Sequence, residues 1–248
     1  LHDALPISKP MTAWDIGVNG VIGLLELARD KNLSVFTPSS IGVFGPETPH
    51  DPTPQDTVCR PRTMYGITKV AGELLSDYYR AKYGVDARSV RYPGLISHVT
   101  PPGGGTTDYA VDIYWKAVEH GRYASPLAEG TRLPMMFMAD ALRAAIELME
   151  ADASRLRHFN SFNVGAMSFA PEDVAASIRR RMPGFELTYE GNPLLQGFAE
   201  SWADALDDTT AREEWDWKPE YDLDAMTDVM LEAISERLGG KSGHSSQA

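Results

Sequence analysis

The fold is decided by a short apolar segment, Leu33-Ser-Val-Phe-Thr37, which Pro38 ends. A short apolar run that a breaker ends is typical of a strand buried on both faces, as in a parallel sheet. Before it, apolar residues recur at helical spacing from Thr12 to Asn32, and Thr12 with Asp15 matches a capping box. The sequence therefore predicts a long helix that leads into a buried parallel strand.

The same order of elements continues along the chain. Residues 46–63 are rich in proline and predict a surface loop. Residues 64–83 fit a helix with Gly84 as its C-terminal cap, and residues 85–92 predict the next strand. A series of helix, strand, loop, helix and strand implies an α/β fold, in which helices pack on a parallel sheet.

The composition excludes several classes of protein. With 248 residues, 43% apolar and 23% charged, the chain resembles an ordinary globular protein. Its net charge of −12 argues against a nucleic-acid partner. The single cysteine, Cys59, excludes an intrachain disulfide, and no histidine stands at metal-ligand spacing from it, so we expect a reducing cytoplasm and no metal site. Neither a membrane span nor a signal peptide is recognisable.

Two Tyr-x-x-x-Lys pairs are the candidates for chemistry, because this spacing places both side chains on one helix face. Tyr65 and Lys69 stand at the start of the predicted helix 64–83, whereas Tyr78 and Lys82 stand near its end. We interpret the second pair as an aromatic residue beside a solvated lysine. Ser40 follows the predicted strand, and ligands bind at the carboxyl ends of parallel strands. Ser40, Tyr65 and Lys69 can therefore converge.

Several segments resemble a known family. Residues 37–45, 64–69 and 91–95 are similar to the extended short-chain dehydrogenase/reductase superfamily. Residues 91–97, 103–110 and 133–138 look like its NAD-dependent L-threonine 3-dehydrogenase branch. The likeness implies a partial Rossmann-like doubly wound sheet with a small C-terminal substrate lobe. It also implies NAD as cofactor and L-threonine as a small-molecule substrate that is oxidised to 2-amino-3-oxobutanoate.

The resemblance also implies roles for single residues. Tyr65 would take the proton from the threonine hydroxyl, Ser40 would orient that hydroxyl, and Lys69 would hold the nicotinamide ribose. The pKa of free tyrosine is about 10, so a tyrosine base needs a neighbouring cation such as Lys69. Ser39 competes with Ser40 for its role. The implied cofactor contacts are Ser39, Tyr65, Lys69, Tyr92, Pro93 and Leu95, and the implied substrate contacts are Ser40, Tyr65, Thr106 and Thr107.

Some of these residues also have a purely structural interpretation. Residues 92–95 fit the end of a strand and a turn, and the Gly-rich segment 103–107 fits a flexible linker. Asn19 matches the asparagine of the superfamily's proton relay, or lies on a helix surface. Both interpretations stay open.

One part of the family's pattern is missing. Its members begin with a strand, a Gly-rich turn and a helix that bind the pyrophosphate. No G-x-x-G-x-x-G follows a strand near the start, and Gly17, Gly20 and Gly23 lie within the predicted helix. Residues 1–8 match nothing in the family. We therefore expect an N-terminally truncated chain that lacks roughly 60 to 90 residues and is inactive alone.

The resemblance divides the chain into four parts. Residues 1–8 are a non-native leader, and 9–97 form the C-terminal half of the NAD-binding domain. Residues 98–238 form mainly the substrate lobe with returning Rossmann elements, and 239–248 are a disordered tail. The helices 12–29 and 64–83 match a pair that forms a two-fold interface, which predicts a homodimer. Two alternatives stay open: a nucleotide-sugar epimerase or dehydratase, and a non-catalytic dimerisation or binding module.

Overall fold

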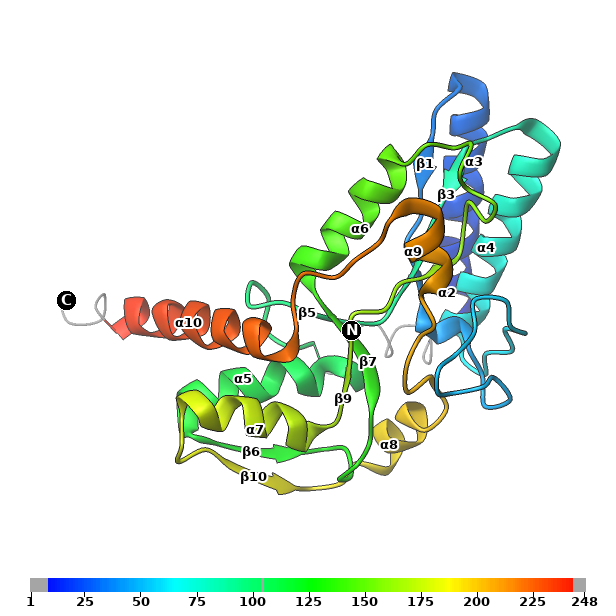
Figure 1. Cartoon of the computed structure of the whole chain (residues 1–248). Coiled ribbons are helices and arrows are strands. Elements are labelled where there is room, and N and C mark those ends of the chain that lie inside the picture. Colours follow the sequence, from blue (N-terminus) through cyan, green and yellow to red (C-terminus); the bar gives the residue numbers. More distant parts are fainter. Residues whose placement is uncertain (1–8, 104, 243–248) are drawn as a thin grey trace, which may run out of the picture.

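The computed structural model describes residues 9–103 and 105–242 (Figure 1). In the first half of the chain, two parallel strand pairs lie behind the helices, and they bring residues 35–40 beside residues 87–92. The elements of this half are α2 (Pro10–Trp14), the π-helical turn η1 (Asp15–Asn19), α3 (Gly20–Lys31), β1 (Val35–Phe36), β2 (Ser39–Ser40), the 3₁₀ turn η2 (Ile41–Val43), α4 (Met64–Tyr83), β3 (Ala87–Arg88) and β4 (Val90–Tyr92). The predicted α/β class with parallel strands is confirmed.

The second half contributes a second group of strands and most of the remaining helices. Here β5 pairs in parallel with β7, β7 pairs antiparallel with β9, and β6 pairs in parallel with β10. The elements are β5 (Gly94–Ile96), η3 (Thr106–Asp108), α5 (Tyr109–His120), β6 (Arg122–Ser125), β7 (Leu133–Phe137), α6 (Met138–Glu150), β8 (Phe162–Asn163), β9 (Met167–Phe169), α7 (Pro171–Arg181), β10 (Glu186–Tyr189), α8 (Pro193–Ala199), α9 (Thr209–Trp215) and α10 (Leu223–Ser242).

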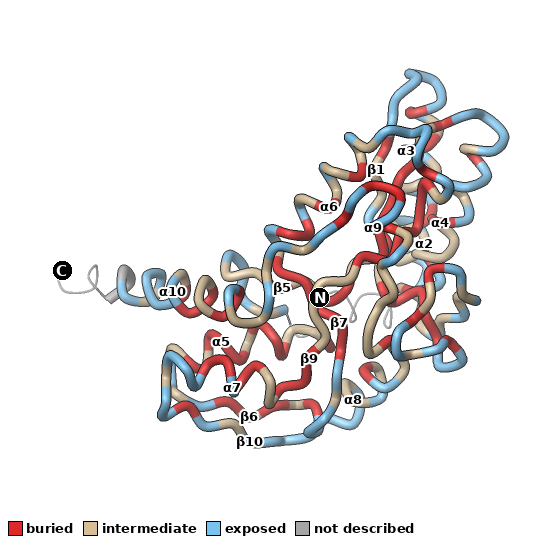
Figure 2. Tube along the Cα trace, viewed as in Figure 1, coloured by how far each residue is buried: buried red, intermediate tan, exposed pale blue. Residues whose placement is uncertain are grey.

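Separate apolar cores hold the two groups of elements. One core joins α5, α7 and α10 to the β5–β7–β9 sheet, through residues such as Ile113, Phe137 and Met230. Another packs α6 and α9 against β4 and β8, where Trp215 and Trp217 are buried. Since β8 pairs with β4, residues from the second half complete the sheet of the first. Figure 2 shows buried residues along β7 and β9 at the centre of the molecule.

The structure corrects several local expectations. The predicted capping box at Thr12 is wrong, because the first helix begins at Pro10 and no side chain caps it. The π-helical turn η1 interrupts the expected continuous helix. Leu33 is 49% exposed and precedes β1, so only the later part of the predicted strand is buried.

The ends of the chain need a further correction. Helix α10 runs through residues 239–242, which we expected in the disordered tail. The predicted leader, 1–8, and the rest of that tail, 243–248, lie outside the described residues. Within the described part of the chain, no helix is long and apolar enough to cross a membrane.

Candidate functional site

Ser40 and Tyr65 meet where the strand pair β2–β4 ends. Ser40 is the last residue of β2, and its Oγ accepts a hydrogen bond from the Gly42 amide at 3.2 Å. Thr63 caps α4 by accepting from the Gly66 amide at 3.0 Å, which places Tyr65 in the first helical turn. A Cβ built on Gly42 would lie 2.9 Å from the Tyr65 ring and 3.6 Å from Ser40 Oγ. Glycine therefore lets the Tyr65 ring approach the turn that carries Ser40.

Lys69 lies one helical turn after Tyr65 on α4. Its Nζ is 5.5 Å from the centroid of the Tyr65 ring and donates a hydrogen bond to the Pro38 carbonyl at 2.7 Å. Burial lowers the pKa of Lys69, and the attraction of Glu73 opposes that change. A half-buried ammonium at this position would stabilise a phenolate on Tyr65. The predicted convergence of Ser40, Tyr65 and Lys69 is thus present in the structure.

The structure places the two adjacent serines in different surroundings. Ser39 is buried, and its hydroxyl donates to Glu73 Oε1 at 2.6 Å. Ser40 is half-buried and contacts the Gly42 turn instead. This separation follows from strand geometry, because successive side chains point to opposite faces. The geometry favours Ser40 over Ser39 as the serine that faces Tyr65.

Tyr92, Pro93 and Leu95 lie along the neighbouring strand. Tyr92 is the β4 partner of Ser40, and its hydroxyl donates to the Ala141 carbonyl at 2.7 Å. Burial raises the pKa of Tyr92 well above its usual range. Pro93 is buried, and Leu95 in β5 is half-buried against the α6 core. The segment therefore borders the Ser40 edge through its backbone, with the Tyr92 hydroxyl bonded to α6.

Thr106 and Thr107 form the 3₁₀ turn η3. Thr106 is buried, and a Cβ built on Gly94 would lie 2.8 Å from the Thr107 methyl group. Asp108 accepts backbone N–H groups from Gly103 and Gly105 at 2.6 and 2.9 Å. The Gly-rich segment is thus a hydrogen-bonded turn packed on the Tyr92–Gly94 segment, and the interpretation as a flexible linker does not fit it.

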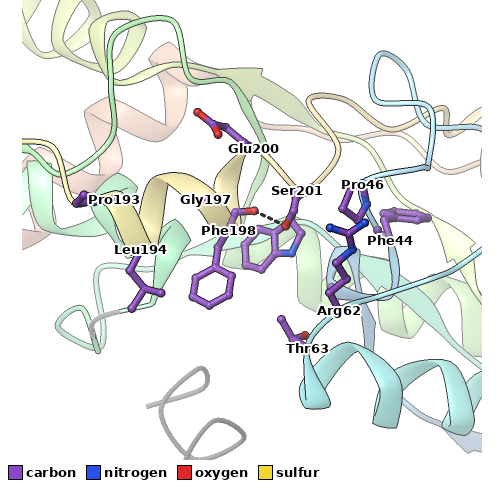
Figure 3. Close-up of a pocket in the computed structure, with 13 residues that line it drawn as sticks. Phe44, Pro46, Arg62, Thr63, Pro193, Leu194, Gly197, Phe198, Glu200 and Ser201 are labelled. Carbon is purple, nitrogen blue, oxygen red and sulfur yellow. Dashed lines mark hydrogen bonds between the residues drawn. The ribbon is translucent and has the colours of Figure 1, made fainter.

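A cavity of about 460 Å³ borders Gly42 and Thr63 (Figure 3). Figure 3 shows Leu194 and Phe198 of α8 on one side of it and Arg62 with Thr63 on the other. Trp202, just after α8, also lines the cavity. The sequence analysis missed this wall, because α8 is a short helix more than a hundred residues from Tyr65 along the chain. Its one local signal is Asn192, which caps α8 ahead of Pro193.

The other side of Lys69 faces a second cavity, of about 290 Å³, between α3 and α4. Phe36, Pro38 and Ser39 also line it, so it opens at the carboxyl end of β1. An apolar wall and a buried cation at a strand end fit the nicotinamide half of a dinucleotide. Gly17 and Gly20 line the same cavity from helical turns, as the sequence predicted.

Two further sequence expectations can be located. Asn19 ends the π-helical turn η1, and its side chain donates to Asp15 Oδ1 at 2.9 Å on the surface. Among residues 9–103 and 105–242, no three His, Cys, Asp or Glu side chains gather into a group that could hold a metal ion.

Known proteins share this arrangement over most of the chain. Residues 2–165 match the NAD dependent epimerase/dehydratase family. An uncharacterised epimerase/dehydratase of Staphylococcus haemolyticus is 54% identical over 241 residues, which are 97% of this chain and 76% of that protein.

Two solved structures extend the comparison. The L-threonine dehydrogenase of Clostridium difficile is 54% identical, with a TM-score of 0.93 over 96% of this chain and 74% of its own. The holo form of the GalE-like L-threonine dehydrogenase of Cupriavidus necator is 51% identical, with a TM-score of 0.91 over 94% of this chain and 75% of its own. NAD is the cofactor of the family, and the surroundings of Lys69 fit it. The chain belongs to the NAD dependent epimerase/dehydratase family.

Proposed function

We propose that the protein is a cytoplasmic, NAD-dependent oxidoreductase that oxidises the side-chain hydroxyl of L-threonine to 2-amino-3-oxobutanoate. The observation that carries the proposal is the convergence of Ser40, Tyr65 and Lys69 around Gly42, beside a cavity. The likeness to L-threonine dehydrogenases of known structure supports this choice of substrate.

Each of the three residues has its own task. Tyr65 takes the proton from the threonine hydroxyl, and Ser40 orients that hydroxyl by a hydrogen bond. Lys69 stabilises the phenolate of Tyr65 by its charge and donates an N–H group to the nicotinamide ribose. NAD, when bound, supplies the acceptor for the hydride that leaves the hydroxyl-bearing carbon.

The remaining contacts follow from the edges of the two cavities. We assign Tyr65, Lys69, Pro93, Leu95 and the backbone at Ser39 and Tyr92 to the nicotinamide side. The Ser39 and Tyr92 hydroxyls are already bonded to Glu73 and Ala141. We assign Thr106 and Thr107 to the amino acid, because their turn packs on the strand that borders Ser40.

The test is a substrate assay on the full-length gene product. L-Threonine with NAD should give NADH and 2-amino-3-oxobutanoate. A nucleotide-sugar epimerase or dehydratase would use the same tyrosine and lysine, so UDP-sugars are assayed in parallel. Turnover of UDP-sugars without NADH formation from millimolar L-threonine would refute the proposal. Turnover of neither substrate would favour a non-catalytic module.

We also propose a homodimer that forms through α3 and α4, which lie side by side (Figure 1). The two helices carry several large apolar side chains that are exposed, namely Leu24, Leu27, Ile67, Leu74 and Tyr78. A second copy related by a two-fold axis would cover the same residues on both chains. Sedimentation should therefore give a dimer for the wild type and a monomer for Leu74→Asp. Leu142→Asp, which changes a similarly exposed leucine on α6, should stay dimeric.

A further inference from the structure

Two successive residues ahead of Ser40 are held by side chains of α4. Lys69 Nζ donates to the Pro38 carbonyl at 2.7 Å, and the Ser39 hydroxyl donates to Glu73 Oε1 at 2.6 Å. Lys69 and Glu73 are four residues apart, so they lie on the same face of α4. The helix that carries Tyr65 therefore also fixes the strand that ends in Ser40, at two points directly before it.

Glu73 is itself held from the neighbouring strand. Arg91 of β4 binds it in a bidentate manner, with Nε 3.0 Å from Oε1 and Nη2 2.9 Å from Oε2. Both side chains are only 8% exposed. Arg91 is the strand partner of Ser39, and its Nη1 donates to the Gln55 carbonyl and to Asn163 Oδ1 at 3.1 and 3.3 Å. The Glu73 carboxylate thus joins α4, β2 and β4 at one buried point.

A buried ion pair of this kind is not explained by stability alone. Such pairs add little net stability, because desolvation of two charges offsets their attraction, although removal of one partner leaves an unpaired buried charge. Their geometry is nevertheless well defined, since a bidentate guanidinium–carboxylate contact fixes both planes. Glu73 also has an electrostatic effect, because its charge opposes the effect of burial on the pKa of Lys69.

We propose that Glu73 is a positioning residue which, together with Arg91 and Ser39, holds Ser40 in line with Tyr65 and keeps Lys69 positively charged. This inference rests on the proposed roles of Ser40, Tyr65 and Lys69. It assigns the second serine of the Ser39–Ser40 pair a task of its own: Ser40 faces the reaction, and Ser39 anchors the strand.

Two variants of Glu73 separate the two parts of this role. Glu73→Gln removes the charge and keeps the length of the side chain, whereas Glu73→Asp keeps the charge and shortens the side chain by one methylene. Glu214→Gln is the matched control. Glu214 is also a buried glutamate in contact with an arginine, Arg157, but it lies on α9. A loss of stability alone would be common to all of these variants.

The first measurement is independent of catalysis. The protonation of Lys69 is followed by NMR in the full-length protein without substrate, with ¹³C-labelled lysine and the resonance assigned through Lys69→Arg. Glu73→Gln should lower the pKa of Lys69, which corresponds to an acid dissociation constant at least about tenfold larger. Glu73→Asp and Glu214→Gln should leave it near the wild-type value. An unchanged Lys69 titration in Glu73→Gln would overturn the electrostatic part.

The second measurement is the pH profile of kcat. Glu73→Gln should lower kcat at least about tenfold and move the rising limb to higher pH, because a less charged Lys69 stabilises the Tyr65 phenolate less. Glu73→Asp should lower kcat without moving the limb, since it shifts only Ser40. If both variants match Glu214→Gln in rate and in profile, the positioning role is refuted. If the wild type does not oxidise L-threonine at all, the proposed function fails, and the NMR titration still decides whether Glu73 controls Lys69.

Discussion

Helix α4 carries the same Tyr-x-x-x-Lys spacing at both ends, and the two pairs differ in every respect except the spacing. At the C-terminal end, Lys82 Nζ donates to the Tyr78 hydroxyl at 2.9 Å, and Tyr78 is 47% exposed. That hydrogen bond lowers the pKa of Tyr78 and raises the pKa of Lys82. At the N-terminal end, Lys69 is bonded to the Pro38 carbonyl and lies 5.5 Å from the centre of the Tyr65 ring.

The comparison shows that direct contact between tyrosine and lysine does not make a site. The exposed pair has the closer contact and a tyrosine with a lowered pKa, yet its neighbours are the rings of Tyr79 and Tyr83. The other pair has a strand end, the Ser40 hydroxyl, the Gly42 turn and a cavity beside it. Chemistry at the first turn of α4 therefore depends on what the parallel strands bring to that turn.

The largest expected effect separates the two tyrosines. Tyr65→Phe should lower kcat for threonine oxidation at least about 100-fold, which is the lower range for the loss of a general base. Tyr78→Phe should leave kcat within about twofold of the wild type, because we assign it no part in the reaction. Initial rates of NADH formation by the two full-length variants provide the measurement. A larger loss in Tyr78→Phe would mean that the wrong pair has been chosen.

The two serines should differ in the same direction. Ser40→Ala should lower kcat about tenfold to a hundredfold, because it removes a hydrogen bond to the reacting hydroxyl. Ser39→Ala should have a smaller effect, since its hydroxyl is bonded to Glu73 and acts on the reaction only through the strand. Steady-state kinetics of both variants test this order. The reverse order would assign Ser39 to the substrate.

A smaller effect is expected from the glycine that separates Ser40 from the tyrosine ring. Gly42→Ala should lower kcat by about tenfold, because the new Cβ would stand 2.9 Å from the Tyr65 ring, and small displacements of reacting groups are costly. Gly23→Ala on α3 is the control, since a Cβ there meets nothing within 4 Å. That change should leave kcat unaltered and stabilise the helix by about 1 kcal/mol. Equal kinetics in both variants would show that the close approach at Gly42 is unimportant.

The smallest effect concerns the alkaline titration of the C-terminal tyrosines. Tyr78 should ionise below the ordinary pKa of tyrosine, whereas the hydrogen bond to Glu26 raises the pKa of Tyr79 to about 12. Because the folded state raises the pKa of Tyr79, its contribution to stability is complete below pH of about 10 and is lost as the pH rises toward 12. Phenolate absorbance of Tyr78→Phe and Tyr79→Phe should resolve the two steps. A single shared step would contradict this assignment.

Local patterns predicted the N-terminal site well. Helix α4 follows its apolar spacing, its cap at Gly84 is present, and the convergence of Ser40 with Tyr65 follows from the rule for parallel strand ends. The α/β class and the family rest on the same segments.

Features that depend on distant partners could not be predicted in this way. Glu73 resembles any surface glutamate of a helix until Arg91 and Ser39 are placed against it. The cavity wall of α8 and Trp202 has no pattern that links it to Tyr65. Strands β5 and β9 are only three residues long, which is too short for a period to be visible.

The most direct test of the central claim is the fate of the hydrogen on the side-chain carbon of threonine. The full-length protein is incubated with NAD and L-threonine deuterated at that carbon, and the mass of the reduced cofactor is measured. If the Tyr65 site oxidises the side-chain hydroxyl, the deuterium should appear in the reduced nicotinamide, and Tyr65→Phe should slow its appearance about 100-fold or more. Unlabelled NADH, or labelling at an equal rate in Tyr65→Phe, would contradict the account.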